Sequence, residues 1–222
     1  MASPPLLEWT KSMTHLKLVS RWAAACLIAS AIAQCGWAQA DDAPVNLLKN
    51  PSMEESEKNA AGEEDVASWK RGDDVPGVAY PWKPTSGVGG KAGLGIKKTA
   101  NKYFPIAQFT QTIPHTGSET VLQLSAQVKT KAATKAVLDV QFLDEKGEWI
   151  SHEWIAYIGS QGNQPKPLSH NWKAYTGAVT IPPNTKQIVI GLQDYGPGEV
   201  WFDDVSAVYL KELPKEPNNV PK

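Results

Sequence analysis

The chain of 222 residues carries 22 basic and 23 acidic residues, which leaves a net charge of −1 at pH 7. Lys and Arg form no cluster along it, so neither nucleic-acid binding nor docking on an anionic membrane has an electrostatic basis. Both cysteines, Cys26 and Cys35, lie within the first 40 residues, so a disulfide is excluded in the rest of the chain.

The first 40 residues have the pattern of a secretory signal peptide. Lys17 and Arg21 precede an apolar run at 22–33, and the small-residue sequence AQA ends at Ala40. We expect cleavage after Ala40 and export of the remainder, either secreted or kept in the periplasm or cell envelope. The run is shorter than the roughly 20 apolar residues of a spanning helix, so no membrane insertion is expected after cleavage. An uncleaved anchor and a lipoprotein attached through Cys35 are the alternatives.

The predicted mature chain, 41–222, keeps 19 basic and 22 acidic residues. An exported domain without disulfides depends on its core, with the help of a metal where one binds. About 180 residues are enough to bury roughly 70% of the unfolded chain's surface, so we predict one domain at 41–210. The segment 211–222 has three prolines and no apolar pattern, which predicts a disordered tail.

Strand-like runs recur every dozen or so residues beyond residue 44, separated by Gly, Pro, Asn or Asp, and no amphipathic helix pattern interrupts them. This rhythm predicts an all-β fold, a two-sheet antiparallel β-sandwich. The segment 55–68 is polar and is predicted to be a surface loop with a short helical turn, and 86–95 is a glycine-rich turn. The predicted strands lie at 45–49, 66–71, 94–98, 104–113, 121–130, in a hairpin at 136–150, and at 172–181, 186–195 and 200–210.

Apolar and polar residues alternate along the clearest strands, so one face of each is core and the other is wet or faces a ligand. In 121–130, for example, Leu122 and Leu124 share a face opposite Gln123. The same alternation places four residues away from the core: Asp139, Gln141, Gln193 and Tyr195.

Three features of the chain resemble parts of catalytic motifs. Gly90-Lys91 is followed by Ala92 and by no helix, which excludes a phosphate-binding loop. His152-Glu153 has no second histidine one helical turn further on, which excludes a zinc-protease motif. Asp139 and Glu153 could face one groove as the carboxylate pair of a glycosidase, although ordinary solvent-exposed charges explain them more simply.

The run VWFDDV at 200–205 places two adjacent carboxylates, Asp203 and Asp204, in an apolar strand. Neighbouring side chains point to opposite faces, so one of the two is expected on the buried face. A buried unpaired carboxylate costs several kcal/mol or takes up a proton. Either a bound cation or a set of N–H donors is therefore expected at this position.

Several segments occur in a familiar order: NLLKNPSMEE at 46–55, a later Trp69, the glycine-rich SGVGGKAGLGIK, LQLSAQVKT, and finally VWFDDV. In this order the chain resembles the carbohydrate-binding modules of the CenC-like group (families 4, 9 and 22), which are galactose-binding-like jelly rolls often attached to cellulases and xylanases. The resemblance runs from about Asn46 to Leu210. Met53 stands where the family usually has phenylalanine as a core anchor.

The resemblance implies a structural calcium ion held by Glu54, by Asp203 and by carbonyl groups of the glycine-rich segment. Ca²⁺ takes about six to eight oxygen ligands, and two carboxylates would neutralise it. Such an ion would join the first strand to the last. The alternative is that backbone N–H groups alone cap Asp203.

A sugar site needs aromatic platforms beside amides and carboxylates. The resemblance implies that the Tyr103 strand and the strand face bearing Gln193 and Tyr195 contact the sugar, while Trp69, Trp172 and Trp201 are structural. We expect Asp139 and Gln141 to complete a groove. Tyr80 and Trp82, in VAYPWKP, are predicted to form an exposed platform; for each aromatic residue the alternative is that it covers a sheet edge.

The sequence therefore predicts non-catalytic binding of polysaccharide or oligosaccharide, with a glycosidase or an envelope protein as a further partner. The competing hypotheses are a structural or adhesion module of the cell envelope that binds a protein, and a glycoside hydrolase or an accessory subunit of one.

Overall fold

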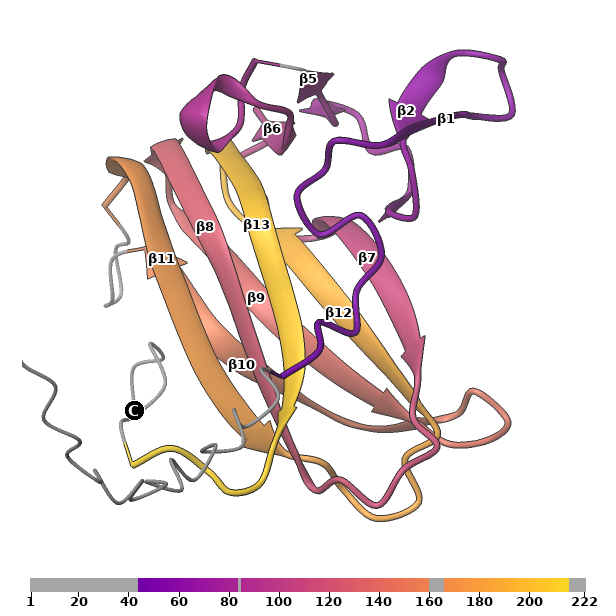
Figure 1. Ribbon diagram of the computed structural model, residues 1–222. Helices are drawn as coiled ribbons and strands as arrows, with labels where there is room; N and C mark the ends of the chain where they lie inside the picture. The colour runs from indigo at the N-terminus through magenta and orange to yellow at the C-terminus, as the bar shows by residue number, and fades with distance from the viewer. Residues whose placement is uncertain (1–43, 84, 160–165, 216–222) are drawn as a thin grey trace, which may run out of the picture. The chain divides into compact units, whose positions relative to one another are not determined.

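A computed structural model describes residues 44–83, 85–159 and 166–215 (Figure 1). The predicted signal peptide at 1–40, with its cleavage after Ala40 and the alternative at Cys35, lies outside the described residues. So does the end of the predicted tail, 216–222, whereas residues 211–215 are exposed and form no strand. Among the described residues, no helix is long and apolar enough to cross a membrane.

Two antiparallel sheets form a sandwich, which confirms the predicted fold class. The first is five-stranded, in the order β10-β9-β12-β7-β3, and consists of β3 (Lys70–Arg71), β7 (Ala107–Pro114), β9 (Lys135–Leu143), β10 (Trp149–Gly159) and β12 (Gln187–Asp194). The second is six-stranded, in the order β11-β8-β13-β6-β4 with β5 also on β6, and consists of β4 (Val78–Ala79), β5 (Trp82–Lys83), β6 (Gly93–Lys98), β8 (Val121–Ala133), β11 (Leu168–Thr180) and β13 (Gly198–Leu210).

The core lies between the sheets, where the alternating apolar residues meet. Burying one such side chain completely contributes about 1.5–3 kcal/mol. The predicted face assignments are confirmed, because the apolar members of each alternating strand are fully buried: Leu122, Leu124, Val128, Leu138, Val140, Phe142, Ile188, Ile190, Leu192 and Phe202.

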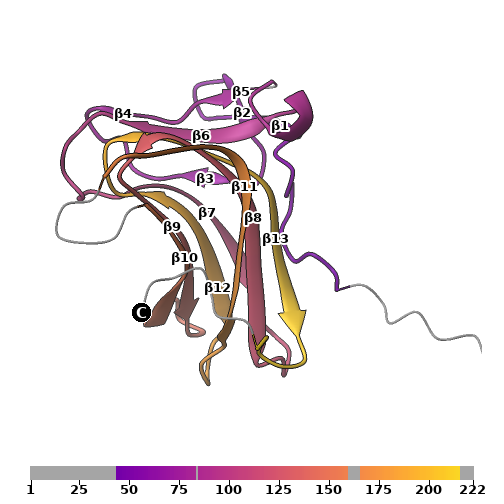
Figure 2. The same ribbon diagram turned by 90° about the vertical axis from the view of Figure 1, so that its left-hand side faces the viewer.

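The strands β7, β9 and β12 bend along their length, as Figure 2 shows. The outer face of the five-stranded sheet lies on the inside of that bend. The polar residues that alternate with the core residues therefore share one outward, curved face.

The two asparagines of the N-terminal motif at 46–55 form hydrogen bonds with distant parts of the chain. The Oδ1 atom of Asn46 accepts from the N–H of Ala207 in β13 at 3.0 Å. Asn50 has a φ of 45°, a left-handed conformation that Asn tolerates, and its Nδ2 donates to the carbonyl of Ala67 at 2.9 Å. Its own carbonyl accepts from Nε1 of Trp69 at 3.1 Å, which ties this segment to a core tryptophan.

Two expectations about the N-terminal third are wrong. Residues 45–49 form no strand, although Leu47 donates its N–H to the carbonyl of Ala207 at 2.8 Å beside β13. The segment 55–68, expected to be a loop, contains the hairpin of β1 (Ser56–Lys58) and β2 (Glu64–Val66). Every residue of β1 is exposed and polar. The sequence therefore has no alternation of apolar and polar residues here that would have predicted a strand.

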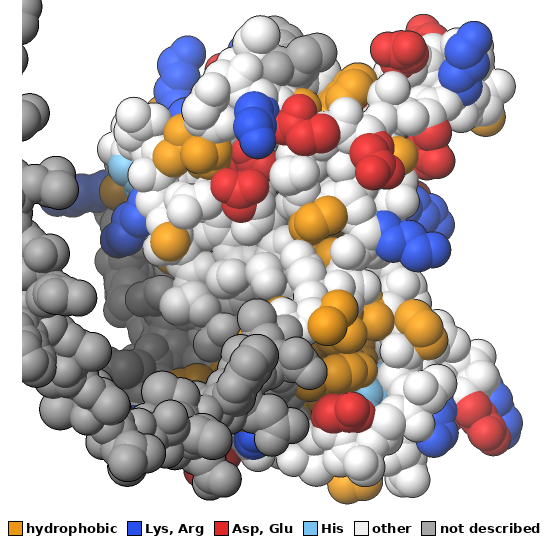
Figure 3. Space-filling model, in the orientation of Figure 1, with side chains coloured by type: hydrophobic (Ala, Val, Ile, Leu, Met, Phe, Trp, Pro, Cys, Tyr) orange, Lys and Arg blue, Asp and Glu red, His pale blue; other side chains and the backbone are white. Residues whose placement is uncertain are grey.

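Charged side chains of both signs are dispersed over the face of the molecule in Figure 3. Several form pairs, such as Lys97 with Glu199 at 3.1 Å and Arg71 with Asp65 at 2.8 Å. This agrees with the balanced charge of the sequence.

Candidate functional site

The glycine-rich turn brings the predicted metal residues together. Asp203 is 2% exposed, and its Oδ2 accepts from the N–H of Val88 at 2.7 Å. The exposed Glu54 reaches the same turn from another segment, because its Oε1 accepts from the N–H of Ala92 at 3.0 Å. Gly87 allows this approach, since a Cβ there would lie 2.6 Å from Oδ2 of Asp203.

Asp203 does not point into the core between the sheets. Its neighbour Phe202 does, and Asp203 shares the outer face of β13 with Trp201, where the glycine-rich turn covers it. Burial raises the pKa of the Asp203 carboxyl, the N–H groups of Val88 and Asp204 oppose this, and the carboxylates of Asp204 and Glu54 raise it further. A positive charge at this position would stabilise the ionised carboxylate and lower its pKa.

The donor set fits a calcium ion only in part. Glu54 and Asp203 supply two carboxylates, and the turn supplies the carbonyl of Ala92, which lies beside Oδ2 of Asp203 next to Gly87. No group of three or more His, Cys, Asp or Glu side chains that could hold a metal occurs among the described residues. The other ligands would therefore be carbonyls and waters, which suits Ca²⁺ better than a transition metal.

The outer face of the five-stranded sheet collects most of the predicted sugar-binding residues. We call it the aromatic face. It comprises Tyr103, Phe104, Lys135, Asp139, Gln141, Trp149, His152, Trp154, Tyr157, Gln193 and Tyr195.

A buried carboxylate forms the centre of the aromatic face. Asp139 is 1% exposed, and its Oδ2 accepts from Nε2 of Gln141 at 2.9 Å and from Nε2 of Gln193 at 3.2 Å. Its Oδ1 is hydrogen-bonded to Nδ1 of His152 at 3.0 Å. Gly191, opposite Asp139 on β12, leaves room for this network, because a Cβ there would meet Gln193 at 3.2 Å. The predicted residues Asp139, Gln141 and Gln193 thus form one network.

Aromatic rings flank this network on both sides. Trp149 lies 5.4 Å from the ring of His152, and Trp154 lies 5.9 Å from Tyr195. The ring of Tyr103 follows, 6.4 Å from Tyr195. The exposed fraction is 57% for Trp149 and 40% for Tyr103, so flat apolar surfaces are open to solvent at each end.

Sequence reasoning missed the residues that β10 contributes: Trp149, His152, Trp154 and Tyr157. Register shifts occur between Trp149 and Ser151 and between Trp154 and Ala156. Each bulge adds a residue, so simple alternation does not show which of these side chains share a face. Alternation would have grouped His152 with Trp154, which are two residues apart in unbroken register, but only the two bulges bring Trp149 and Tyr157 onto the same face.

Tyr80 and Trp82 do not belong to the aromatic face, and they form no exposed platform. Tyr80 is 9% exposed and packs edge-on against Phe109 of the core at 5.3 Å. Trp82 is half-buried in β5, and its Nε1 donates to the carbonyl of Met53 at 2.8 Å. The prolines around them predicted a loop, but the short strands β4 and β5 hold both rings against the sandwich.

The tryptophans assigned to structure differ in location. Trp69 is 4% exposed in the core, as predicted. Trp172 is half-exposed and does not pack the core; Nζ of Lys129 lies 4.6 Å from its ring centroid and 5.5 Å from that of Trp201. Both rings lie on the outer face of the six-stranded sheet, opposite to the aromatic face.

A buried lysine holds the segment that carries Tyr103. Lys98 is 2% exposed, and its Nζ donates to the carbonyls of Tyr103 at 3.1 Å, of Pro105 at 3.0 Å and of Tyr195 at 2.8 Å. Asp194 is fully buried nearby, and among the described residues only the N–H of Gly196 approaches its carboxylate, too poorly aligned for a regular hydrogen bond but close enough to lower its pKa. Burial raises the pKa of Asp194 to about 8, against the attraction of the Lys98 ammonium.

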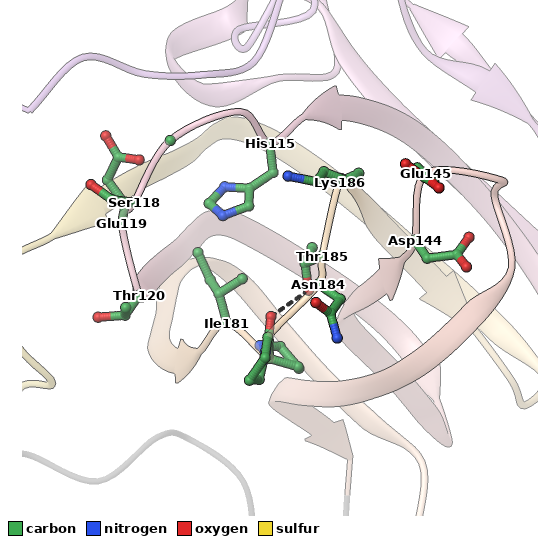
Figure 4. A pocket seen from close by; sticks show the side chains of 13 residues that line it. His115, Ser118, Glu119, Thr120, Asp144, Glu145, Ile181, Asn184, Thr185 and Lys186 are labelled. Carbon is green, nitrogen blue, oxygen red and sulfur yellow. Dashed lines mark hydrogen bonds between the residues drawn. The ribbon is translucent and has the colours of Figure 1, made fainter.

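A cavity of about 730 Å³ lies between the loops at one end of the sandwich (Figure 4). It is lined by residues of the β7–β8, β9–β10 and β11–β12 connections, including Glu119, Asp144 and Lys186. The one aromatic ring among the residues that line it belongs to His115, which is 6% exposed. Nδ1 of His115 is hydrogen-bonded to the hydroxyl of Tyr209 at 2.8 Å. Without an open aromatic platform, this cavity suits a sugar less well than the aromatic face.

The two carboxylates considered for a glycosidase lie on opposite faces. Asp139 is paired with Trp154, whereas Glu153 is paired with Val140, whose side chain belongs to the core face. They therefore cannot flank one sugar, as acid and base would have to.

No protein-family model matches the sequence, and no curated protein does. Solved structures match the fold. The CBM22-1-CBM22-2 tandem of Xyn10C from Paenibacillus barcinonensis aligns with a TM-score of 0.51 at 15% identity, over 79% of this chain and 49% of that one. A putative sugar binding protein from Bacteroides thetaiotaomicron gives 0.51 at 13%, over 75% and 100%.

The enzymatically active domain of tailspike protein 4 from bacteriophage CBA120 also aligns, with a TM-score of 0.51 at 19% identity, over 74% of this chain and 21% of that one. The chain thus spans about a fifth of the tailspike chain and half of the tandem. At these identities the similarity establishes the fold, which is the β-sandwich that carbohydrate-binding modules also have.

Proposed function

We propose that this chain binds polysaccharide or oligosaccharide without catalysis, on the aromatic face. The observation that carries the proposal is the row of rings from Trp149 to Tyr103 beside the Asp139 network. A pyranose has an apolar face that stacks on a ring and a rim of hydroxyls that bonds to amides and carboxylates. The aromatic face offers rings for the first and the more exposed side chains of Gln141 and His152 for the second, while the buried Asp139 holds both of these polar side chains in place.

The shared fold with a tandem of carbohydrate-binding modules and with a putative sugar binding protein supports this proposal. An enzyme is the weaker candidate, because Asp139 and Glu153 lie on opposite faces. A structural or adhesion module would bind a protein partner through the same exposed rings. That alternative is distinguished by the absence of any sugar affinity.

The proposal includes a calcium ion and export. Glu54, Asp203 and carbonyls of the glycine-rich turn would hold the ion, which would join the N-terminal segment to β13. The signal pattern at 1–40 supports a secreted, periplasmic or envelope location, with lipidation at Cys35 as the alternative. A glycosidase system would be the natural companion of such a module.

Affinity electrophoresis against xylan, β-glucan, mannan and galactan tests the function. We expect retardation by at least one polysaccharide, with loss of retardation in Trp154→Ala. Trp172→Ala is the matched control, because its ring is also half-exposed and also carries a lysine ammonium, but on the opposite sheet. Absence of retardation by every polysaccharide would refute the function, and equal loss in both variants would refute the site.

A further inference from the structure

A lysine ammonium lies among four rings of the aromatic face. Nζ of Lys135 is 4.0 Å from the ring centroid of Trp154 and 4.0 Å from that of Tyr195. The rings of Tyr103 and Tyr157 follow at 5.6 Å and 5.7 Å. All four distances are within the range of cation–π attraction, so the rings hold the ammonium in a defined position.

The donors of this ammonium are not used within the described part of the chain. None of the ion pairs or side-chain hydrogen bonds there involves Nζ of Lys135. Burial lowers the pKa of Lys135, and no neighbouring charge contributes. Asp139 lies on the same face of β9, and its carboxylate is already hydrogen-bonded to Gln141, Gln193 and His152.

Two other lysines show what a satisfied ammonium looks like in this fold. Lys129 also lies over a tryptophan, but it donates to the carbonyl of Ser86 at 3.0 Å. Lys98 donates to three carbonyls. Lys135 lies among aromatic rings but has no oxygen acceptor within the described residues. Its ammonium therefore keeps three N–H groups that can donate to a ligand.

We propose that the aromatic face selects acidic polysaccharides and that Lys135 binds the carboxylate of a uronic acid residue. This assignment rests on the proposed function and adds its substrate class. A carboxylate accepts charge-assisted hydrogen bonds from an ammonium, which are stronger than those from a neutral hydroxyl. The fixed position of Lys135 means that little side-chain freedom is lost on binding. The neighbouring rings would stack on the apolar faces of the same chain of sugars.

The test compares glucuronoxylan with the same polymer after chemical reduction of its carboxyl groups to alcohols, so that the two probes differ only at the carboxylate. Affinity electrophoresis of the full chain is run with the wild type and with Lys135→Met, which keeps an apolar stem among the rings. Lys131→Met is the charge-matched control, because Lys131 is exposed on the other sheet beside Glu199. Thermal unfolding checks that each variant is folded.

We expect the native polymer to retard the wild type about ten-fold more strongly than the reduced polymer. Lys135→Met should remove this difference, and Lys131→Met should keep it. Raising the salt from about 0.05 M to 0.5 M should weaken binding of the native polymer only, because added ions screen the charge pair.

Equal retardation by both polymers would overturn the assignment while leaving the proposed function intact. Tighter binding of the reduced polymer by Lys135→Met would also overturn it, because the lysine would then merely cover the rings. Retardation by neither polymer, nor by any neutral glycan, would refute the function itself.

Discussion

Nδ1 of His152 lies 3.0 Å from Oδ1 of Asp139, across the β9–β10 pair. With the amides of Gln141 and Gln193, this contact completes the set of partners that lets a carboxylate be buried on a sheet face. Asp139 therefore fixes three polar side chains in place beneath the rings.

Replacing Asp139 by Asn should loosen this network. One carboxylate oxygen becomes an NH₂ group, so the charge is lost and only one oxygen is left to accept, either from Gln141 and Gln193 or from His152. We expect the free energy of unfolding to fall by about 1–3 kcal/mol, together with weaker sugar binding. Urea unfolding and calorimetric titration measure the two effects. Asp74→Asn, at an exposed loop position, is the control, and equal behaviour of the two variants would contradict the role given to Asp139.

Lys98→Met should release the segment that carries Tyr103. The buried carbonyl of Tyr195 and the partly buried carbonyls of Tyr103 and Pro105 lose their donor. A buried carbonyl left unsatisfied costs about 1–3 kcal/mol unless the segment moves to water. We expect faster hydrogen exchange at 99–106 and weaker binding. Lys97→Met is the control, since Lys97 is exposed and forms its ion pair with Glu199. Unchanged exchange in Lys98→Met would show that Lys98 does not hold the segment.

Asp194 should make stability depend on pH. Burial raises its pKa to about 8, whereas an unfolded chain gives Asp about 3.9. Between these two pKa values the folded protein binds one proton more than the unfolded chain. The stability that this proton contributes is complete below about pH 4 and is lost as the pH rises through about 8. The free energy of unfolding falls by up to about 1.4 kcal/mol per pH unit on the way. Asp194→Asn should flatten the pH profile of urea unfolding between pH 5 and 9 and be the more stable form at pH 9. The same slope in variant and wild type would assign the dependence to another group.

Calcium should raise the melting temperature of the wild type, and a chelator should lower it. Asp203→Asn should lose most of this response, since one of the two carboxylates is gone. Asp204→Asn is the control, because Asp204 is exposed at the adjacent position. A melting temperature indifferent to calcium in the wild type would leave the N–H groups of Val88 and Asp204 as the whole explanation of the buried carboxylate.

Alternation was sufficient to predict the sandwich and the polar side of β9 and β12. Residues such as Leu138 and Ile190 repeat with the period of a strand, so Asp139 and Gln193 could be assigned to the opposite face from sequence alone. Position on a face is a local property, and period-two patterns report it directly.

The rest depends on relations that the pattern does not contain. The two bulges of β10 put Trp149 and Tyr157 on the same face as His152 and Trp154, and a bulge has no periodic signature. Tyr80 is buried because Phe109, on another strand, lies against it. Trp172 lies on the outer face, where the ammonium of Lys129 on the neighbouring strand β8 packs over its ring. Each of these is decided by tertiary pairing.

The central claim is that sugar binds on the aromatic face, and the indole N–H signals of the tryptophans test it most directly. In an NMR titration with xylan, glucan, mannan and galactan oligosaccharides, the signals of Trp149 and Trp154 should shift, while those of Trp172 and Trp201 stay in place. Single substitutions assign the signals. Shifts confined to Trp172 and Trp201 would place binding on the opposite sheet, and no shift with any oligosaccharide would contradict the claim altogether.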